Sequence, residues 1–430
     1  MFPFLDFVNQ SPTAFHAVAQ AAAALRAAGF RPLEECEDWE LLPGGGYFVT
    51  RNGSSLIAFT LPKGRLTHFQ LVCSHSDSPM FKLKPQAEDR APGNAIRLNV
   101  EVYGGGIFST WLDRPLGIAG RVLVEGEQGI ESRLVDLGRD CVLIPNMPIH
   151  FNREVNKGYA WNPQVDLLPL FAQSGETGLL AEAVKEAAQG ARVLASDLFV
   201  YNRTPGTVWG PRGEFFSCPR IDNLECAYTS LQAFLQAGEA AHSNVYALFD
   251  NEEVGSSTKQ GADSTFLEDV LSRICQALGM TDSRRRAAIA ASFMASADNA
   301  HALHPNHPEK FDAQNRVVMN EGVVIKHNAN QKYTTDGVSC ALFTQICERA
   351  GVKVQHFTNR SDVPGGSTLG NIANTHVSMN TVDIGLGQLA MHSAYETAGT
   401  ADADFMIQAL KALYRTEIRM LGDGKFALEG

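Results

Sequence analysis

The length, composition and charge of the chain limit the classes of protein to which it can belong. The chain has 430 residues, and 36 Lys+Arg against 47 Asp+Glu give a formal net charge of −11. This charge argues against a general nucleic-acid-binding protein, which needs a basic surface. Apolar residues make up 44% and charged residues 19% of the chain, which is close to ordinary globular usage and disfavours disorder and a coiled coil. At roughly 150 residues per domain, the length is consistent with two or three domains, or with one large α/β unit carrying an insertion.

The cysteines and the N-terminal sequence predict a cytoplasmic protein. The 8 cysteines are scattered, without a C-x-x-C spacing or a dense framework of the secreted type, so we expect reduced thiols. The N-terminal sequence MFPFLDFVNQSP lacks a basic region and carries Asp6 within its apolar stretch, which is not typical of a secretory signal. The longest apolar segment, at 17–28, is interrupted by Gln20 and Arg26, which indicates a soluble helix and no membrane span.

The first part of the chain is predicted to form a helix followed by strands. Ser11-Pro12 favours a helix start and Gly29 a helix end, on either side of an Ala-rich run. Apolar segments at 56–61 and 68–73 predict two strands. The second strand leads directly into the polar sequence SHSDSP at 74–79, so that polar groups gather at its carboxyl end.

The sequence pattern changes between about residue 85 and residue 219. Short β-like segments such as 121–125, several prolines and a single helical pattern at 177–188 occur there. We therefore predict that residues 86–219 form an inserted, mainly β domain. Residues 1–85 and 220–430 are then expected to form one domain that the insertion interrupts.

Helix and strand patterns alternate after the insertion. Such alternation predicts an α/β fold with a mixed, partly parallel sheet flanked by helices. The predicted helices are 223–237, 265–278, 336–350 and 397–421, and the predicted strands are 245–249, 292–296, 352–357 and 376–384.

Acidic residues and histidines follow several of the predicted strands. The ligand crevice of an open α/β sheet lies beyond the carboxyl ends of its strands, so these side chains are candidates for a common site. Each acid taken singly could equally be an exposed helix N-cap. The adjacent Glu252 and Glu253 are harder to explain in that way, because neighbouring carboxylates repel each other unless a cation or a proton lies between them. The candidates are His75, Asp77, Asp222, Glu252, Glu253, Asp298 and His392.

A catalytic metal site would resolve this repulsion. Carboxylates mixed with imidazoles, without cysteine, suit Zn²⁺, Mn²⁺ or Co²⁺, whereas a structural zinc site prefers thiolates. A carboxylate can bridge two cations about 3.5–4 Å apart, and such a pair both activates a water molecule and polarises a carbonyl. One of the two glutamates could then bind metal while the other acts as a base.

Other motifs give weaker predictions. His301, His304 and His307 follow one another closely, but Pro305 and Pro308 interrupt the helix that would present them on one face. A three-histidine zinc site is therefore disfavoured. The chain also contains no G-x-S-x-G motif, which disfavours a serine hydrolase.

Five blocks of sequence carry the candidate residues, in the order SHSDSP (74–79), PRIDNL (219–224), DNEEVGS (250–256), SADNAH (296–301) and MHS (391–393). In this order they closely resemble the M18 family of metalloaminopeptidases, the aspartyl aminopeptidases. The resemblance extends to IHFNR (149–153), VIK (324–326) and RSDVPGGST (360–368), so it covers nearly the whole chain.

The resemblance implies a peptidase domain with two divalent metal ions, interrupted by a dimerisation domain and assembled through dimers into a tetrahedral dodecamer. By this resemblance His75 and Asp298 would hold one ion. Glu253 and His392 would hold the other ion, and Asp222 would bridge the two.

The resemblance also implies roles for residues around the metal ions. Glu252 would be the general base, and Asp77 would orient His75. His150 would project from the dimerisation domain into the active site of a partner subunit and donate to the oxyanion there.

The preferred substrate side chain is less strongly implied than the peptidase activity. The turn reads VPGG at 363–366, where relatives often carry Pro-Cys-Gly. Lys326 matches a position that faces an acidic side chain of the substrate, although a lysine at a strand end is by default solvated. His301 is a second residue expected to contact substrate.

Together these residues predict a homo-oligomeric metalloaminopeptidase that releases N-terminal amino acids, with Asp and Glu as candidate substrates and zinc as the expected metal. Two alternatives remain open from the sequence. One is a related metal-dependent deacylase or carboxypeptidase with the same metal site. The other is a non-catalytic, self-assembling scaffold that retains the metal site.

Overall fold

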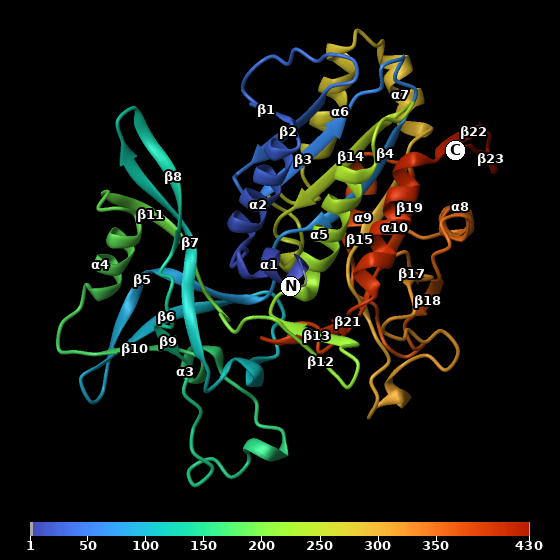
Figure 1. Cartoon of the computed structure of the whole chain (residues 1–430). Helices are drawn as coiled ribbons and strands as arrows, with labels where there is room; N and C mark the ends of the chain where they lie inside the picture. Colours follow the sequence, from blue (N-terminus) through green and yellow to red (C-terminus); the bar gives the residue numbers. More distant parts are fainter. Residues whose placement is uncertain (1–2, 430) are drawn as a thin grey trace.

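The computed structural model describes residues 3–429, which form two large β-sheets with helices packed on them. The large sheet has nine strands and the second sheet has seven, and two smaller sheets of five and two strands accompany them. Figure 1 shows the large sheet and its helices on the right and the second sheet on the left. The predicted fold class, a mixed α/β protein with a mainly β insertion, is confirmed at this level.

The large sheet is partly parallel, as predicted. Its four central strands, β14, β4, β15 and β19, run parallel to one another. Strands β3 and β17 pair antiparallel with β14 and β19 on either side of this centre. In spatial order the strands are β1 (Arg31–Leu33), β2 (Gly46–Arg51), β3 (Ser55–Thr60), β14 (Ser243–Phe249), β4 (Phe69–His75), β15 (Phe293–Ala297), β19 (Asn380–Gly385), β17 (Val323–His327) and β18 (Val354–Thr358).

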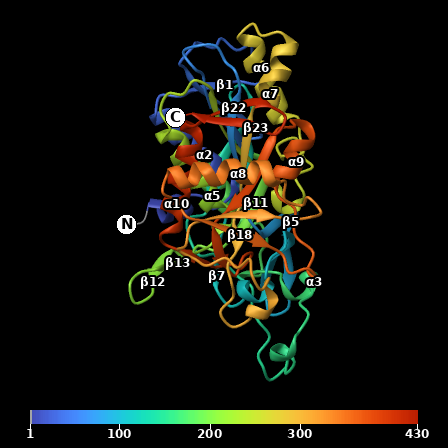
Figure 2. The same ribbon diagram turned by 90° about the vertical axis from the view of Figure 1, so that its right-hand side faces the viewer.

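Helices cover both faces of the large sheet, which explains why its central strands are apolar on both sides. The helices on one face share a hydrophobic cluster with sheet residues such as Val72 and Ala295, and those on the other face pack against neighbours such as Leu71 and Met294. The first face carries α2 (Ala14–Ala27), α5 (Ile221–Gln236), α8 (Gly337–Arg349) and α10 (Asp402–Arg415), and the second face carries α6 (Phe266–Ala277), α7 (Asp282–Ala290) and α9 (Leu369–His376). In Figure 2, α8 runs across the side of the molecule that faces the viewer.

The second sheet is antiparallel and encloses its own hydrophobic cluster with α4 (Leu179–Ala187). It begins at Met80 and ends at Tyr201, whereas the predicted insertion spans residues 86–219. Sheet membership does not by itself define an independent folding unit, so the division into domains stays a prediction. The strands are β5 (Met80–Ala91), β6 (Ala95–Tyr103), β7 (Pro115–Gly126), β8 (Gly129–Asp136), β9 (Val142–Leu143), β10 (Leu170–Gln173) and β11 (Val193–Tyr201).

Residues 144–169 extend away from the second sheet between β9 and β10, at the bottom of Figure 1. This projecting segment contains only a short helical turn, η2 (Val155–Lys157), and a short helix, α3 (Pro163–Asp166). Several large apolar side chains on it face solvent, and Phe151 is the most exposed of them at 83%.

A small five-stranded sheet joins parts of the chain that are distant in sequence. Its strands come from the segment after the second sheet and from the segments near residues 300 and 390. They are β12 (Thr207–Trp209), β13 (Phe215–Cys218), β21 (Glu396–Gly399), β20 (Gly387–Leu389) and β16 (Ala300–His301). The remaining elements are α1 (Pro3–Asn9), the short turns η1 (Phe108–Trp111), η3 (Glu252–Val254) and η4 (Pro308–Lys310), and the hairpin of β22 (Glu417–Gly422) and β23 (Lys425–Glu429).

The closing helix is shorter than the predicted range of 397–421, which was wrong at both ends. Residues Glu396–Gly399 form β21 and pair with β13, and residues Glu417–Gly422 form β22 and pair with β23. The helix α10 occupies only Asp402–Arg415. Pairing with β13, which is distant in sequence, overrides the local helical pattern at the first end, and a hairpin with the following strand β23 replaces the helix at the second end.

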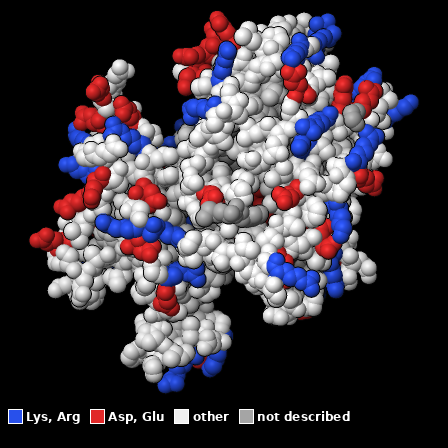
Figure 3. Space-filling view, viewed as in Figure 1, with Lys and Arg blue, Asp and Glu red and all other residues white. Residues whose placement is uncertain are grey.

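The surface and the helix lengths add two observations. Acidic and basic side chains are interspersed over the face shown in Figure 3. Within residues 3–429, no helix combines the length and the apolar character that crossing a bilayer requires.

Candidate metal centre

The candidate residues come together at one edge of the large sheet. Strands β14, β4 and β15 are adjacent and parallel, so their carboxyl ends meet there. His75 is the last residue of β4, Asp298 directly follows β15, and the turn η3 with both glutamates follows β14 closely. The start of α5 contributes Asp222, and the segment between β20 and β21 contributes His392.

The Asp222 carboxylate lies between two imidazoles. Its Oδ1 atom is 3.5 Å from Nε2 of His75, and its Oδ2 atom is 3.3 Å from Nε2 of His392. Each imidazole also faces a second carboxylate, since His75 Nε2 is 3.4 Å from Oδ1 of Asp298 and His392 Nε2 is 3.3 Å from Oε2 of Glu253. Asp222 can therefore present one oxygen to each of two neighbouring cations.

The buried polar atoms of this site fit bound metal. The side chains of Asp222 and Glu253 are only 5% and 3% exposed. Their Oδ1 and Oε1 atoms are buried without a hydrogen-bond partner. A buried carboxylate oxygen without a donor is costly unless a cation neutralises it. The imidazole and carboxylate donors are those of catalytic zinc-type sites, so the residues suit the group that the sequence predicts.

Burial and the closeness of other carboxylates raise the pKa values of both glutamates at this site. Burial, opposed by the nearby His75 and reinforced by Asp298, raises the pKa of Glu252 to about 8. Burial and the charge of Asp222 raise the pKa of Glu253 well above its ordinary value. The attraction of His392 and His75 outweighs burial at Asp222 and lowers the pKa of that carboxyl. Without added positive charge, the glutamates favour their neutral forms.

Asp77 supports both His75 and the turn that carries the glutamates. Its Oδ1 atom is 3.3 Å from Nδ1 of His75, and its carboxylate accepts the backbone N–H groups of Glu252 and Glu253 at 3.2 Å each. The hydroxyl of Tyr103 donates to Oδ2 of Asp77 at 2.6 Å. Tyr103 belongs to the second sheet, and no local sequence signal marks it as part of this site.

Glu396 supports the other side of the centre and was likewise missed from the sequence. Its carboxylate accepts the backbone N–H of His392 at 2.7 Å and that of Asp222 at 3.1 Å. Burial, reinforced by the charge of Asp222, raises the pKa of Glu396 to about 8. The Nδ1 atom of His392 lies 3.0 Å from the carbonyl oxygen of Gly105, an acceptor that places the ring proton on Nδ1 and leaves Nε2 for a metal.

The two residues expected to contact substrate lie beside the centre. Lys326 is buried, and its Nζ atom donates to the carbonyl oxygen of Asp298 at 2.8 Å and to Oδ2 at 3.2 Å. His301 is exposed on β16 and lies within electrostatic reach of Lys326, Asp222 and Asp298.

His150 is not brought to the centre within one chain. It is exposed on the projecting segment between β9 and β10. Across residues 3–429, no hydrogen bond or ion pair links it to the residues described above. Its predicted catalytic role therefore depends on a second copy of the chain.

The family membership follows from comparison with known proteins. Residues 7–414 match the family model for the aminopeptidase I zinc metalloproteases, M18. The chain belongs to the M18 family. Its relatives include a protein of Clostridium acetobutylicum described as a probable M18 family aminopeptidase 2, which is 43% identical over 95% of this chain and 97% of its own length. A protein of Clostridium novyi with the same description is 42% identical over 95% of this chain and 97% of its own length. The predicted family and the general class, a metal-dependent aminopeptidase, are confirmed.

Solved structures agree with this M18 assignment. A subunit in the complex of Ape4 and Nbr1 is 36% identical, with a TM-score of 0.92 over 96% of this chain and 84% of that chain. The crystal structure of prApe1 is 28% identical, with a TM-score of 0.91 over 96% of this chain and 93% of that chain. The mApe1 dodecamer of S. cerevisiae is 28% identical, with a TM-score of 0.83 over 95% of each chain.

Proposed function

We propose that this M18 protein is a dinuclear metalloaminopeptidase that releases N-terminal amino acids from peptides. The observation that carries the proposal is the Asp222 carboxylate, whose two oxygens face His75 and His392 at 3.5 Å and 3.3 Å. In this proposal Asp222 would bridge two ions, His75 and Asp298 would complete one site, and Glu253 and His392 would complete the other. Zinc is the proposed metal, because the family is described as zinc metalloproteases and the donors suit it.

The positions of Glu252 and Glu253 favour different roles for the two side chains. Glu253 lies 3.3 Å from His392 and is the more deeply buried, so it is assigned to metal. Glu252 lies 3.9 Å from His75 with a side chain 16% exposed, so it can reach substrate. When bound at these residues, metal ions would supply a water molecule of lowered pKa and a polarised carbonyl. Glu252 would accept a proton from water at this site and return it to the leaving amine.

Lys326 supports the proposal that acidic N-terminal side chains are accepted. A lysine ammonium has three donors, and the two short contacts to Asp298 use two of them. The Nζ atom also lies 3.5 Å from the carbonyl oxygen of Asn299, which is a long contact, so we propose that the third donor turns to the carboxylate of a bound substrate. We propose His301 as a second substrate contact because it lies at the exposed rim of the same site.

Oligomerisation completes the proposed site. The similar mApe1 is a dodecamer, and we propose a homo-oligomer built from dimers for this chain. The apolar side chains on the projecting segment, including Met147 and Phe151, support an interface there, because monomers rarely expose such a group of residues. His150 lies beside Phe151 and would donate to the oxyanion at a partner's active site.

Metal content and turnover of matched variants test the centre. We expect Asp222→Ala to lose most of both ions, because one bridging carboxylate serves two cations. Glu252→Gln should keep its metal while turnover falls by roughly 10²–10⁴ or more. Glu127→Gln, at an exposed position in the turn between β7 and β8, is the control and should retain full activity. Retention of both ions by Asp222→Ala would contradict the bridge.

Substrate classes separate an aminopeptidase from a deacylase or carboxypeptidase. We expect release of free amino acid from unblocked dipeptide amides and aminoacyl-arylamides. Matching substrates with an acetylated N-terminus and a free C-terminus, which a deacylase or a carboxypeptidase would cleave, should react far more slowly. Faster hydrolysis of the N-acetylated series would overturn the aminopeptidase assignment, and a metal-loaded protein inert towards every substrate would support a scaffold.

Mixing two inactive variants tests the role of His150 in a partner subunit. Loss of one oxyanion donor costs about 10²–10³ in kcat, so His150→Ala should be nearly inactive while retaining its metal. Mixed oligomers of His150→Ala with Glu252→Gln should regain part of the activity, since some sites then combine an intact Glu252 with a partner's intact His150. Verified subunit exchange without recovery would contradict the proposal.

A further inference from the structure

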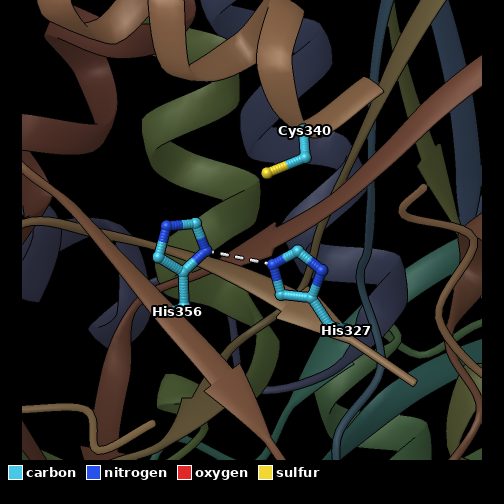
Figure 4. Close-up of side chains that lie close together, drawn as sticks. All are labelled: His327, Cys340 and His356. Carbon is cyan, nitrogen blue, oxygen red and sulfur yellow. Dashed lines mark hydrogen bonds between the residues drawn. The ribbon is translucent and has the colours of Figure 1, made fainter. Parts of the chain in front are cut away.

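Two histidines and a cysteine converge on the large sheet away from the proposed catalytic centre. His327 ends β17, His356 lies in β18 and Cys340 lies in α8. Figure 4 shows the sulfur of Cys340 directed from the helix toward the two imidazole rings, which face each other. One potential ligand atom from each residue lies within 4.8 Å of the others.

Strand register explains why these side chains meet. Strands β17 and β18 are parallel, with Ile325 opposite His356 and His327 opposite Thr358, so these four side chains share one face. Ile325 packs in the same hydrophobic cluster as Phe343 of α8, which identifies this face as the one that the helix covers.

Lys326 lies between Ile325 and His327, and its side chain points to the opposite face of β17. There its amine contacts Asp298 of the catalytic centre. The sheet therefore separates the cluster from that centre, and no ligand proposed for the catalytic ions belongs to the cluster.

The spacing of the cluster is close to that of a tetrahedral metal site. Nε2 of His327 is 3.0 Å from Nδ1 of His356. With Zn–N near 2.0–2.1 Å and Zn–S near 2.3 Å, tetrahedral geometry needs about 3.3 Å between two nitrogens and about 3.6 Å between nitrogen and sulfur. Binding of an ion would therefore need the two nitrogens to separate by a few tenths of an ångström and the sulfur, which lies within 4.8 Å of them, to approach to about 3.6 Å.

The protonation of the histidines also suits metal binding. Burial, reinforced by the neighbouring His356, lowers the pKa of His327, which favours the neutral imidazole that binds metal. A hydrogen bond between two imidazole nitrogens needs one of them as acceptor, so at least one ring already offers a lone pair towards the other.

We propose that His327, Cys340 and His356 form a separate binding site for a borderline divalent cation such as Zn²⁺. A thiolate with two imidazoles favours zinc-type ions over Mg²⁺, Ca²⁺ and Mn²⁺. Since His356 is exposed, the fourth position of the ion is open to water. The ion would link α8 to the edge strand β18 and to its neighbour β17, which fixes an edge of the sheet.

Cobalt substitution distinguishes this site from the catalytic centre. A cysteine ligand gives Co²⁺ an intense sulfur-to-metal charge-transfer absorption, whereas the imidazoles and carboxylates of the catalytic centre do not. We expect this absorption in the cobalt-loaded, untagged full-length protein and its loss in Cys340→Ser, with about one equivalent less metal per chain. Cys36→Ser removes an exposed cysteine elsewhere and should leave the absorption unchanged.

Two outcomes of the cobalt experiment would overturn the proposal. One is a wild-type protein without the absorption, and the other is an equally strong absorption in Cys340→Ser. His356→Gln changes an exposed side chain and serves if Cys340→Ser does not fold, with the same loss expected. As a second measurement, Zn²⁺ should slow alkylation of Cys340 at least about tenfold while alkylation of Cys36 is unchanged, and equal rates with and without Zn²⁺ would contradict the site.

Discussion

The hydroxyl of Tyr103 provides a test of how the second sheet supports the proposed metal centre. It donates to Oδ2 of Asp77 at 2.6 Å and accepts from Nδ2 of Asn251 at 2.8 Å, while the other oxygen of Asp77 faces Nδ1 of His75 at 3.3 Å. Tyr103→Phe removes a donor to a buried carboxylate and leaves the ring in place. A hydrogen bond to a charged group contributes about 1.5–3 kcal/mol, and loss of such an outer partner lowers metal affinity about 10–100-fold. We expect a loss of about 2 kcal/mol, or about 30-fold in metal affinity.

The loss of metal affinity can be measured by following activity as a function of the buffered concentration of free Zn²⁺. The concentration giving half-maximal activity should rise about 30-fold in Tyr103→Phe, with kcat restored at saturating metal. Tyr201→Phe is the matched control, because its hydroxyl also donates to a carboxylate, that of Asp136 at 2.8 Å, within the second sheet. An unchanged midpoint in Tyr103→Phe would refute the reasoning, as would a loss that saturating metal does not restore.

Three further predictions address substrate preference, pH dependence and packing. Lys326→Ala should lower kcat/KM for all substrates, because Asp298 loses its partner. For substrates with an N-terminal Asp or Glu, kcat/KM should fall by a further tenfold or more, which corresponds to about 1.4 kcal/mol. Equal losses for acidic and neutral aminoacyl-arylamides would contradict a role of Lys326 in binding the acidic side chain. Burial and His242 lower the pKa of His68 from 6.5 to about 4. Between these values the unfolded chain binds a proton at His68 that the folded protein does not, so the free energy of unfolding is highest above pH 6.5 and falls as the pH falls towards 4. His68 alone should contribute about 1.4 kcal/mol per pH unit to the loss of stability in this window, as measured by urea unfolding, and His68→Gln should reduce the observed slope by about that amount; an unchanged slope would contradict the assignment. Phe343→Ala empties a fully buried position in α8 and should cost about 3–5 kcal/mol in the same assay, whereas a loss below about 1 kcal/mol would show that the site collapses.

Much of the candidate centre could be predicted from the sequence because parallel strands deliver their carboxyl ends to one edge of a sheet. His75, Asp298 and the two glutamates each end or follow an apolar strand, so local patterns were sufficient to group them. Asp222 and His392, which lie on other elements, were candidates on the same grounds, and the resemblance to a family implied which ion each would hold. The structure places the Asp222 carboxylate between His75 and His392, and His392 between Asp222 and Glu253, while their assignment as ligands stays a proposal.

Residues that act through long-range contacts could not be predicted in this way. Tyr103 comes from β6 of the second sheet, and Glu396 from β21, yet each contacts the backbone or side chains around the metal centre. Neither has a spacing or a motif that marks it. The paired imidazoles of His327 and His356, with Cys340 beside them, depend in the same way on the register of two strands and on the position of α8.

The sequence by itself determined the fold class, the family and the order of the catalytic blocks, because apolar periodicity and short motifs are local properties of the chain. Only the tertiary structure decided where the closing helix begins, since β21 forms by pairing with β13, a strand distant in sequence that local propensity does not contain. It also decided that the carboxylate of Asp222 lies between two imidazoles and that His150 stays exposed on a projecting segment. These features depend on how separate elements pack, and packing is determined by contacts between residues far apart in the sequence.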